Sequence, residues 1–292
     1  MSEISAETGF EKLTLEHLGR LAPDLARDWE AKEPFRYLII DNFLPEQFAE
    51  DILAAYPVPD MSGWDSTTYI HQRKKLTQRS GFSPPIERFF ALTASLEFRD
   101  LVGQICGIKK LIDDPDLIGG GLHQILRGGF LDVHVDYNFH PQTKLHRRLN
   151  LLLYLNKDWC PDYEGYLEFW DFESERLLEK VAPIFNRGVI FETNEVSYHG
   201  HPQPLNTPPD ITRKSLAIYY YTEERDDNVV ADEHNTLYRQ TTGVRGRLKT
   251  LVSGATAMQE RFTQKGVGAL GRNLVNRTYR RIQGLPPDNK AE

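Results

Sequence analysis

The sequence predicts a mainly β core with flanking helices, an α+β chain whose short strands form an antiparallel sandwich or barrel. Six β-type runs separated by Gly, Pro and Asn follow one another between about residue 115 and residue 222. Leucines at helical spacing precede these runs, and a basic segment without β character follows them. The composition, 40% hydrophobic and 26% charged over 292 residues, excludes a disordered or fibrous chain.

Residues 1–110 are predicted to combine helices with one strand. Residues 1 to about 33 carry leucines at the helical period among charged residues, which predicts a helix. The apolar run P-F-R-Y-L-I-I-D predicts a strand. P-E-Q-F-A-E-D-I-L-A-A-Y-P then predicts a helix with Pro45 near its first turn and Pro57 beyond its end. A further amphipathic segment, I-E-R-F-F-A-L-T-A-S-L, completes this part.

The β-type runs of the core are G-L-H-Q-I-L, F-L-D-V-H-V-D, R-L-N-L-L-L-Y-L, Y-L-E-F-W-D, R-G-V-I-F-E-T and K-S-L-A-I-Y-Y-Y-T. We therefore expect three parts along the chain. An N-terminal helical and mixed extension covers residues 1–110, the β core covers residues 111–225, and a basic, mostly helical extension covers residues 226–292.

Cysteine content and the start of the chain predict a cytoplasmic protein. Cys106 and Cys160 are the only cysteines, too few for a disulfide scaffold. The start, M-S-E-I-S-A-E-T-G, lacks the basic and apolar regions of a signal peptide. No apolar run approaches the roughly 18 residues that a membrane span needs.

The segment H-V-D at 134–136 predicts part of a metal site. Residues i and i+2 of a strand point to the same face, so His134 and Asp136 can present an imidazole and a carboxylate side by side. A third ligand is offered by His199, which follows the run R-G-V-I-F-E-T-N-E-V-S-Y, with His201 as its rival. Two imidazoles and one carboxylate leave coordination positions open and suit Fe(II) in O₂ chemistry.

A second group of residues predicts a carboxylate clamp. Arg213 opens the strand R-K-S-L-A-I-Y-Y-Y and shares a face with Ser215. The guanidinium fork matches the two oxygens of a carboxylate. On R-L-N-L-L-L-Y-L, Asn150, Leu152 and Tyr154 share a face, so the phenol of Tyr154 can donate to the same carboxylate.

With these motifs, residues from about 120 to 224 resemble the Fe(II)/2-oxoglutarate-dependent dioxygenase superfamily in its prolyl 4-hydroxylase-like branch. The matching segments are G-G-F-L-D-V-H-V-D, R-L-N-L-L-L-Y-L-N-K-D-W, E-G-Y-L-E-F-W, N-R-G-V-I-F-E-T with Y-H-G-H-P, and R-K-S-L-A-I-Y-Y-Y. The resemblance implies a double-stranded β-helix, or jelly roll, as the catalytic core. It also implies that His134, Asp136 and His199 bind Fe(II), with 2-oxoglutarate and O₂ as cosubstrates and ascorbate as a reductant.

The resemblance further implies how 2-oxoglutarate binds. It pairs Arg213 with the distal carboxylate, adds Tyr154 to that carboxylate, and places Leu152 and Leu167 along the walls, with Ser215 assisting Arg213. The spacing between His199 and Arg213 is longer than in the family, and this extended loop leaves Lys214 as a substitute anchor.

The reaction implied is hydroxylation, because related halogenases lack a carboxylate at the position of Asp136. The branch favours a prolyl or other amino-acid residue of a protein or peptide as substrate. A free small molecule, such as an amino acid or a lipid- or sugar-linked metabolite, is the alternative, and a jelly-roll binding module with a vestigial metal site is a third reading. The sequence leaves the oligomeric state open.

The charge of the chain is distributed unevenly. Nine Lys and Arg residues and one acidic residue, Glu260, lie between residues 244 and 282, whereas the whole chain has a net charge of −7. Such a basic amphipathic tail can contact an anionic membrane or nucleic acid. Packing against the acidic remainder of its own chain is the alternative that we favour.

Overall fold

The computed structural model of the protein describes residues 9–59, 63–225 and 232–239. Its helices are α2 (Gly9–Glu30), α3 (Glu46–Ala54), α4 (Pro84–Ala94), α5 (Leu96–Cys106) and the 3-10 turn η1 (Pro161–Tyr163). Its strands are β1 (Tyr37–Ile40), β2 (Asp65–Tyr69), β3 (Gln72–Gln78), β4 (Gly121–Val135), β5 (His146–Tyr154), β6 (Leu167–Asp171), β7 (Arg176–Val181), β8 (Arg187–Glu192), β9 (Tyr198–His201), β10 (Arg213–Thr222) and β11 (Leu237–Tyr238). Most of the basic C-terminal extension, with its predicted helix and anionic partner, lies outside the described residues.

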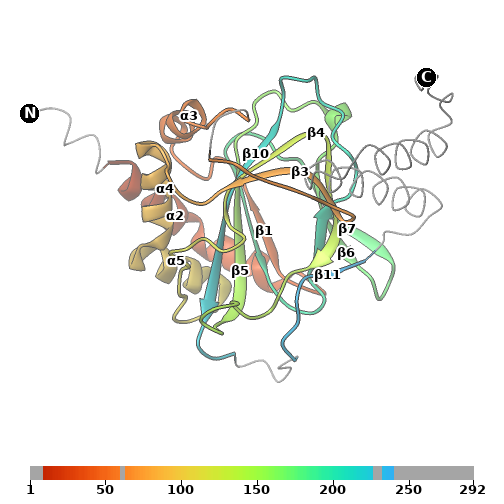
Figure 1. The fold of residues 1–292 in the computed structure, drawn as a ribbon. Coiled ribbons are helices and arrows are strands. Elements are labelled where there is room, and N and C mark those ends of the chain that lie inside the picture. Colours follow the sequence, from red (N-terminus) through yellow and green to blue (C-terminus); the bar gives the residue numbers. More distant parts are fainter. Residues whose placement is uncertain (1–8, 60–62, 226–231, 240–292) are drawn as a thin grey trace, which may run out of the picture.

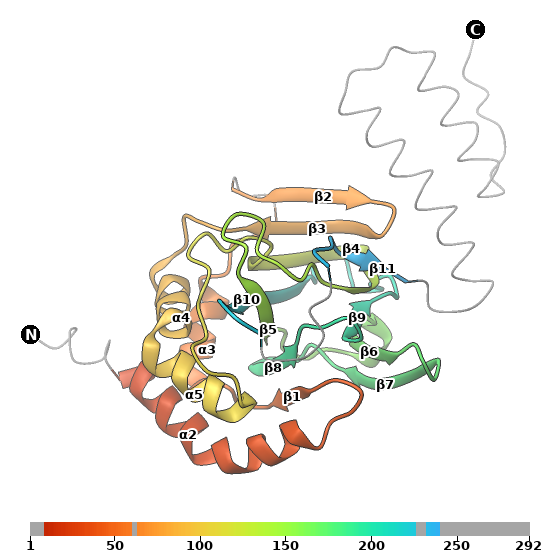
Figure 2. The ribbon, with the colours of Figure 1, turned by 90° about the horizontal axis from the view of Figure 1, so that it is seen from below.

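The strands form one antiparallel sheet that curls into a nearly closed barrel. The order along the sheet is β1-β8-β5-β10-β4-β9-β6-β7, while β3 and β11 also pair with the long strand β4. Figure 1 shows the helices grouped on one side of this barrel, and Figure 2 shows the barrel from below with β2 and β3 at its edge. The predicted jelly roll with flanking helices is therefore confirmed.

Strand alternation divides the residues of β5 and β10 between two environments. Leu149, Leu151 and Leu153 of β5 pack against the helices, together with Leu216 and Ile218 of β10. Asn150, Leu152 and Tyr154 of β5 alternate with these leucines and line a cavity inside the barrel, together with Arg213 and Ser215 of β10. The helices thus cover the outer face of the sheet, and the inner face is free to carry polar groups.

The helices begin and end at residues suited to these positions. Pro84 begins α4, where a missing backbone N–H costs nothing. The hydroxyl of Ser95 caps α5 by accepting a hydrogen bond from the backbone N–H of Phe98 at 3.2 Å. Gly107 ends α5 with a φ of 68°, in the left-handed region that favours glycine.

Strands from the first 110 residues extend the sheet of the core. The predicted strand β1 pairs with β8, and the hairpin β2–β3, which the sequence did not predict, lies along β4. The division of the chain into three parts stays a prediction. Among the described residues, no helix combines the length and apolar character that crossing a membrane requires.

Candidate metal centre and cosubstrate cavity

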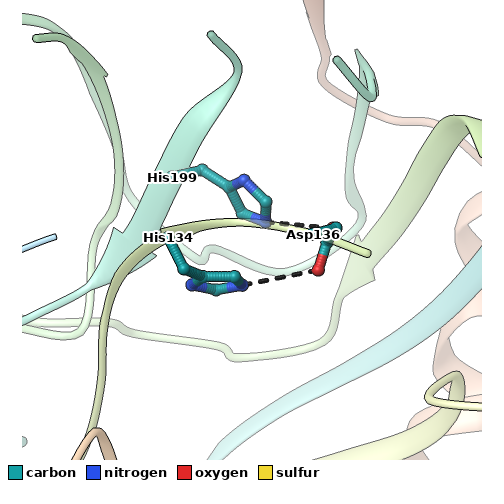
Figure 3. A group of neighbouring side chains, drawn as sticks. All are labelled: His134, Asp136 and His199. Atoms are coloured by element: carbon teal, nitrogen blue, oxygen red, sulfur yellow. Dashed lines mark ion pairs between the residues drawn. The ribbon is translucent and has the colours of Figure 1, made fainter. Parts of the chain in front are cut away.

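The three predicted metal ligands come together inside the barrel. His134 on β4 is the cross-strand partner of His199 on β9, and Asp136 follows directly after β4. One potential ligand atom from each residue lies within 4.8 Å of the other two. Figure 3 shows both imidazoles directed at the carboxylate between them. The Nε2 atoms of His134 and His199 each lie 3.5 Å from a carboxylate oxygen of Asp136.

Backbone carbonyl groups fix the tautomer of both histidines. Nδ1 of His134 lies 2.8 Å from the carbonyl oxygen of Asp132, and Nδ1 of His199 lies 2.9 Å from that of Ser197. A carbonyl oxygen can only accept, so each Nδ1 carries the proton and donates it. Each Nε2 of a neutral ring then presents its lone pair toward Asp136. Burial, with a contribution from His134, lowers the pKa of His199 to about 4 and keeps this ring neutral.

The carboxylate of Asp136 is oriented from behind by two side chains. Nδ2 of Asn150 donates to its Oδ2 at 2.7 Å, and Nη2 of Arg147 lies 3.0 Å from the same oxygen. Burial alone would raise the pKa of Asp136, but the positive charge of Arg147, with the imidazoles beside it, outweighs burial and holds the pKa well below its ordinary value. Neither of these two side chains contacts Oδ1 of Asp136, so this oxygen is available to another ligand.

This donor set fits Fe(II). Two neutral imidazole nitrogens and one ionised carboxylate oxygen converge from one side, which is the arrangement of a 2-His-1-carboxylate site with open positions. The hydrogen bonds to the outer nitrogens and to Oδ2 supply the support that such ligands need. His201, the rival third ligand, lies outside this group of converging atoms.

The predicted carboxylate clamp lies in the same cavity. Arg213 on β10 is buried, and its Nη2 donates to the hydroxyl of Tyr154 at 3.1 Å. Its Nε donates to the carbonyl oxygen of Gly165 at 2.7 Å. Nη1 has no acceptor among the described residues, so it can meet a carboxylate. Desolvation raises the pKa of Tyr154 and keeps its hydroxyl protonated, so that it can donate as well.

A glycine allows the approach of backbone to the clamp. Gly165 has a φ of 73°, and a Cβ atom there would meet Leu205 Cδ2 at 2.3 Å and Arg213 Cδ at 3.2 Å. A larger residue would push its own carbonyl group away from Arg213. Gly165, the glycine of the segment E-G-Y, therefore helps to position the guanidinium group of Arg213.

Every predicted site residue lines one cavity of about 200 Å³: His134, Asp136, His199, Arg213, Tyr154, Ser215, Leu152 and Leu167. Lys214, the substitute anchor, alternates to the other face of β10 and does not line it. The metal end and the clamp end thus belong to a single space.

Two cations of the cavity were missed by sequence reasoning. Arg147 lines it because β5 carries an extra residue at Arg148, as the pairing of Tyr220 with Leu149 and of Tyr221 with Arg147 shows. Strict alternation would have placed Arg148 there instead. Lys75 lines the cavity from β3, a strand that was not predicted. Only the register of the sheet reveals these two residues.

The mouth of the cavity, lined by Tyr69, Thr236 and Tyr238, is built from two further segments. The segment 232–239, which we call the strap, folds back over β4 through the pairing of Tyr238 with His134. The Tyr238 ring stacks on His71 with centroids 4.4 Å apart, and its hydroxyl meets that of Tyr69 on β2. The strap and the hairpin β2–β3 therefore meet beside the metal centre.

Comparisons with known proteins agree with this geometry. Residues 120–221 match the model of the 2OG-Fe(II) oxygenase superfamily. A prolyl hydroxylase from Trichoplax adhaerens, solved with a peptide fragment of the hypoxia inducible factor oxygen degradation domain, is 18% identical, with a TM-score of 0.54 over 72% of this chain and 92% of its own. A prolyl-4-hydroxylase from Pseudomonas putida is 19% identical, with a TM-score of 0.49 over 68% of this chain and 100% of its own. The comparison with curated proteins finds no significant match.

At 18% identity the Trichoplax adhaerens structure supports the fold alone, whereas the family match rests on residues 120–221. That matched segment contains His134, Asp136 and His199, whose side chains converge, together with Arg213 and Tyr154. Residues 120–221 therefore form a 2OG-Fe(II) oxygenase domain, a dioxygenase whose cofactor is Fe(II) and whose cosubstrates are 2-oxoglutarate and O₂.

Proposed function

We propose that His134, Asp136 and His199 hold the Fe(II) of a hydroxylase. The observation that carries this proposal is the convergence of two Nε2 lone pairs and one carboxylate oxygen, each oriented by a hydrogen bond to another atom of its side chain. Bound Fe(II) and 2-oxoglutarate supply the oxygen-activating chemistry, in which 2-oxoglutarate becomes succinate and CO₂ while a substrate C–H bond becomes C–OH. The protein provides ligands, orientation and exclusion of water.

The inner end of the cavity binds 2-oxoglutarate in this proposal. Arg213 and Tyr154 donate to its distal carboxylate, and Ser215, two residues beyond Arg213 on the same face of β10, lies beside them. Leu152 and Leu167 form apolar walls around the carbon chain. Charge-assisted hydrogen bonds in a buried site give the clamp its affinity, because little water competes there.

The substrate that we propose is a prolyl or other amino-acid residue. The solved Trichoplax adhaerens enzyme, which shares the fold, was bound to a peptide. A free small molecule is the second candidate, since the cavity of about 200 Å³ lies below the roughly 300–1,000 Å³ of common ligand pockets. Once 2-oxoglutarate fills its inner end, only one small group of a substrate can enter.

The test is to incubate the protein with Fe(II), 2-oxoglutarate and a panel of prolyl peptides and free amino acids. Succinate is quantified, and mass spectrometry follows the gain of one oxygen atom by each candidate. The proposal expects substrate-dependent succinate that disappears without Fe(II). Succinate formation that persists unchanged in His134→Ala or Asp136→Ala protein would overturn the ligand assignment.

A further inference from the structure

Lys75 enters the cavity because of a bulge in the hairpin strand β3. Tyr69 of β2 pairs with Gln72 and Thr67 of β2 pairs with Lys75, so β3 carries one residue more than β2 between these two pairs. Lys74, at the shift, has a φ of 52°. Without the bulge, residues 72 and 75 would point to opposite faces, but both line the cavity. A bulge that re-aims one side chain beside an active site is a functional feature rather than a defect of the strand.

The ammonium group of Lys75 has no partner among the residues that the structure describes. Within the part of the chain that the structure describes, no hydrogen bond or ion pair is made by its Nζ. Burial nevertheless lowers the pKa of Lys75 to about 8, and the carboxylate of Asp136 offsets this effect only in part. Lys75 is half-buried, and a cation that has lost part of its water without gaining an acceptor favours an anionic ligand.

Arg147, the neighbouring cation, is satisfied by contrast. Its guanidinium pairs with Asp136, donates to Asn150, and lies between the rings of Tyr219 at 3.6 Å and Tyr137 at 4.4 Å. Tyrosine rings lie against its guanidinium, and Nε and Nη2 are both engaged, so Arg147 is held by the protein itself. Lys75, by contrast, is a cation without a protein partner among the described residues that line the cavity.

Lys75 and Arg213 occupy separate positions. Their strands, β3 and β10, flank β4, where Ile125 pairs with both residues. Their backbones are therefore roughly 10 Å apart, two strand spacings. Arg213 is also held by Gly165 and Tyr154, on the side away from β3. A distal carboxylate held between Arg213 and Tyr154 therefore lies toward β5, on the side away from Lys75.

The charge of the loaded cavity supports a second anion. Fe(II), the carboxylate of Asp136, the guanidinium of Arg213 and the two carboxylates of 2-oxoglutarate have no net charge together. Arg147 and Lys75 then leave the cavity positive, and Asp136 is the only acidic residue among the described residues that line it. Like charges confined in a partly desolvated space repel strongly.

We propose that Lys75 binds an anionic group, a carboxylate or a phosphate, of the substrate that is oxidised at the metal. This inference rests on the proposed function and refines it, because a neutral prolyl residue alone would not satisfy Lys75. The substrate presents an anion near the oxidised carbon, as a free carboxylate, an acidic side chain or a phosphorylated group does. Lys75 also orients it relative to the metal.

The experiment titrates small probes into protein loaded with Fe(II) and 2-oxoglutarate without oxygen, so that Arg213 is already occupied. The probes are acetate, inorganic phosphate and neutral acetamide, and calorimetry measures their binding. Acetate or phosphate is expected to bind and acetamide is not, and the two anions distinguish a carboxylate from a phosphate site. Lys75→Met should weaken anion binding by about tenfold or more, the usual value of a charge-assisted hydrogen bond.

Lys74→Met is the matched control, because Nζ of Lys74 donates to the carbonyl oxygen of Arg127 at 2.9 Å and lies outside the cavity lining. It should bind anions as the parent does, and Lys75→Arg should retain most of the affinity. Equal anion binding by Lys75→Met, or acetamide binding as tight as acetate binding, would overturn the proposal. So would a loss of 2-oxoglutarate affinity in Lys75→Met as large as that in Arg213→Met.

Failure of the proposed function is recognised separately, as absence of succinate with every substrate. The anion titration is then made on metal-free Arg213→Met protein, where Lys75 is the remaining free cation. Anion binding to this variant that disappears when Lys75→Met is introduced as a second substitution supports the proposed anion site. If Arg213→Met protein binds no anion at all, the proposal is refuted. In active protein, each anionic candidate is compared with its own amide, and an amide turned over equally well also refutes it.

Discussion

The inner end of the cavity and its mouth are built in different ways. Arg213, Ser215 and Tyr154 project from β10 and β5, neighbouring strands whose eight paired positions lie in the middle of the sheet. The mouth depends on β11, which has two paired residues, and on the exposed hairpin β2–β3. Ladder hydrogen bonds on both sides and helix packing hold the first region, whereas β3 and the two-residue strand β11 pair with β4 alone among the core strands, with side-chain contacts between strap and hairpin.

The difference indicates that the inner end and the mouth of the cavity have different roles. In the proposed function, the inner end binds 2-oxoglutarate, the cosubstrate of the whole superfamily, so it can be rigid. In the same proposal the mouth meets the substrate, and segments at the edge of the sheet can change without disturbing its centre. Four predictions test this comparison, from the largest expected effect to the smallest.

Removing a metal ligand should have the largest effect. Asp136→Ala and His199→Ala are expected to abolish succinate formation and to lose bound Fe(II), measured by metal analysis after gel filtration. His201→Ala should keep the metal, because His201 is outside the converging donor set. Fe(II) retained by His199→Ala but lost by His201→Ala would reverse the assignment of the third ligand.

Removing the clamp should affect the cosubstrate and not the metal. Arg213→Met is expected to weaken 2-oxoglutarate binding by at least about thirtyfold, since one partner of a buried charge pair is lost. Calorimetry on Fe(II)-loaded protein measures this effect. Lys214→Met, the adjacent control on the other face of β10, should bind 2-oxoglutarate normally. The opposite ranking would show that Lys214 is the anchor.

Arg147 is a positioning residue that acts through Asp136. Arg147→Met should lower Fe(II) affinity by about 10- to 100-fold, as loss of a supporting partner of a metal ligand commonly does. Arg147→Lys should recover part of this loss, because the charge remains while the planar stack between two tyrosines does not. Arg148→Met, one residue away and outside the cavity lining, is the control. Equal Fe(II) affinity in all three variants would contradict the role.

The smallest effect should be confined to the strap. Nδ2 of Asn138 donates to the carbonyl oxygen of Asp232, and its Oδ1 accepts from the backbone N–H of His234. Asn138→Ala is expected to speed hydrogen exchange in residues 232–239 by about tenfold while β5 and β10 stay protected. Lys144→Met removes only the exposed pair with Glu233 and should change exchange little. Uniform loosening of both regions would mean that the strap and the sheet are one cooperative unit.

Sequence reasoning succeeded where strand alternation is regular. The side chains of Leu152, Tyr154, Arg213 and Ser215 follow the period of two, so their shared face could be predicted from the printed letters. The jelly roll could be predicted because its β-type runs are short and separated by turn residues.

Sequence reasoning failed where the register between paired strands shifts, or where the paired strands are far apart in the chain. Bulges in β3 and β5 bring Lys75 and Arg147 into the cavity, although simple strand alternation would direct these side chains to the other face. No local sequence pattern indicates either register shift. The hairpin β2–β3 was missed because its run Q-R-K-K-L-T-Q is polar, and its pairing with β4 stabilises it instead. The strap was missed because it pairs with β4 beside the metal centre although it follows the last long strand, β10, and lies far from β4 in the chain.

The most direct test is a crystal structure grown without oxygen in the presence of Fe(II) and 2-oxoglutarate, with anomalous data at the iron absorption edge. We predict one anomalous peak within bonding distance of Nε2 of His134, Nε2 of His199 and a carboxylate oxygen of Asp136. The distal carboxylate of 2-oxoglutarate should lie on Arg213 and Tyr154. A peak on His201, or a distal carboxylate on Lys75 or Lys214, would contradict the account.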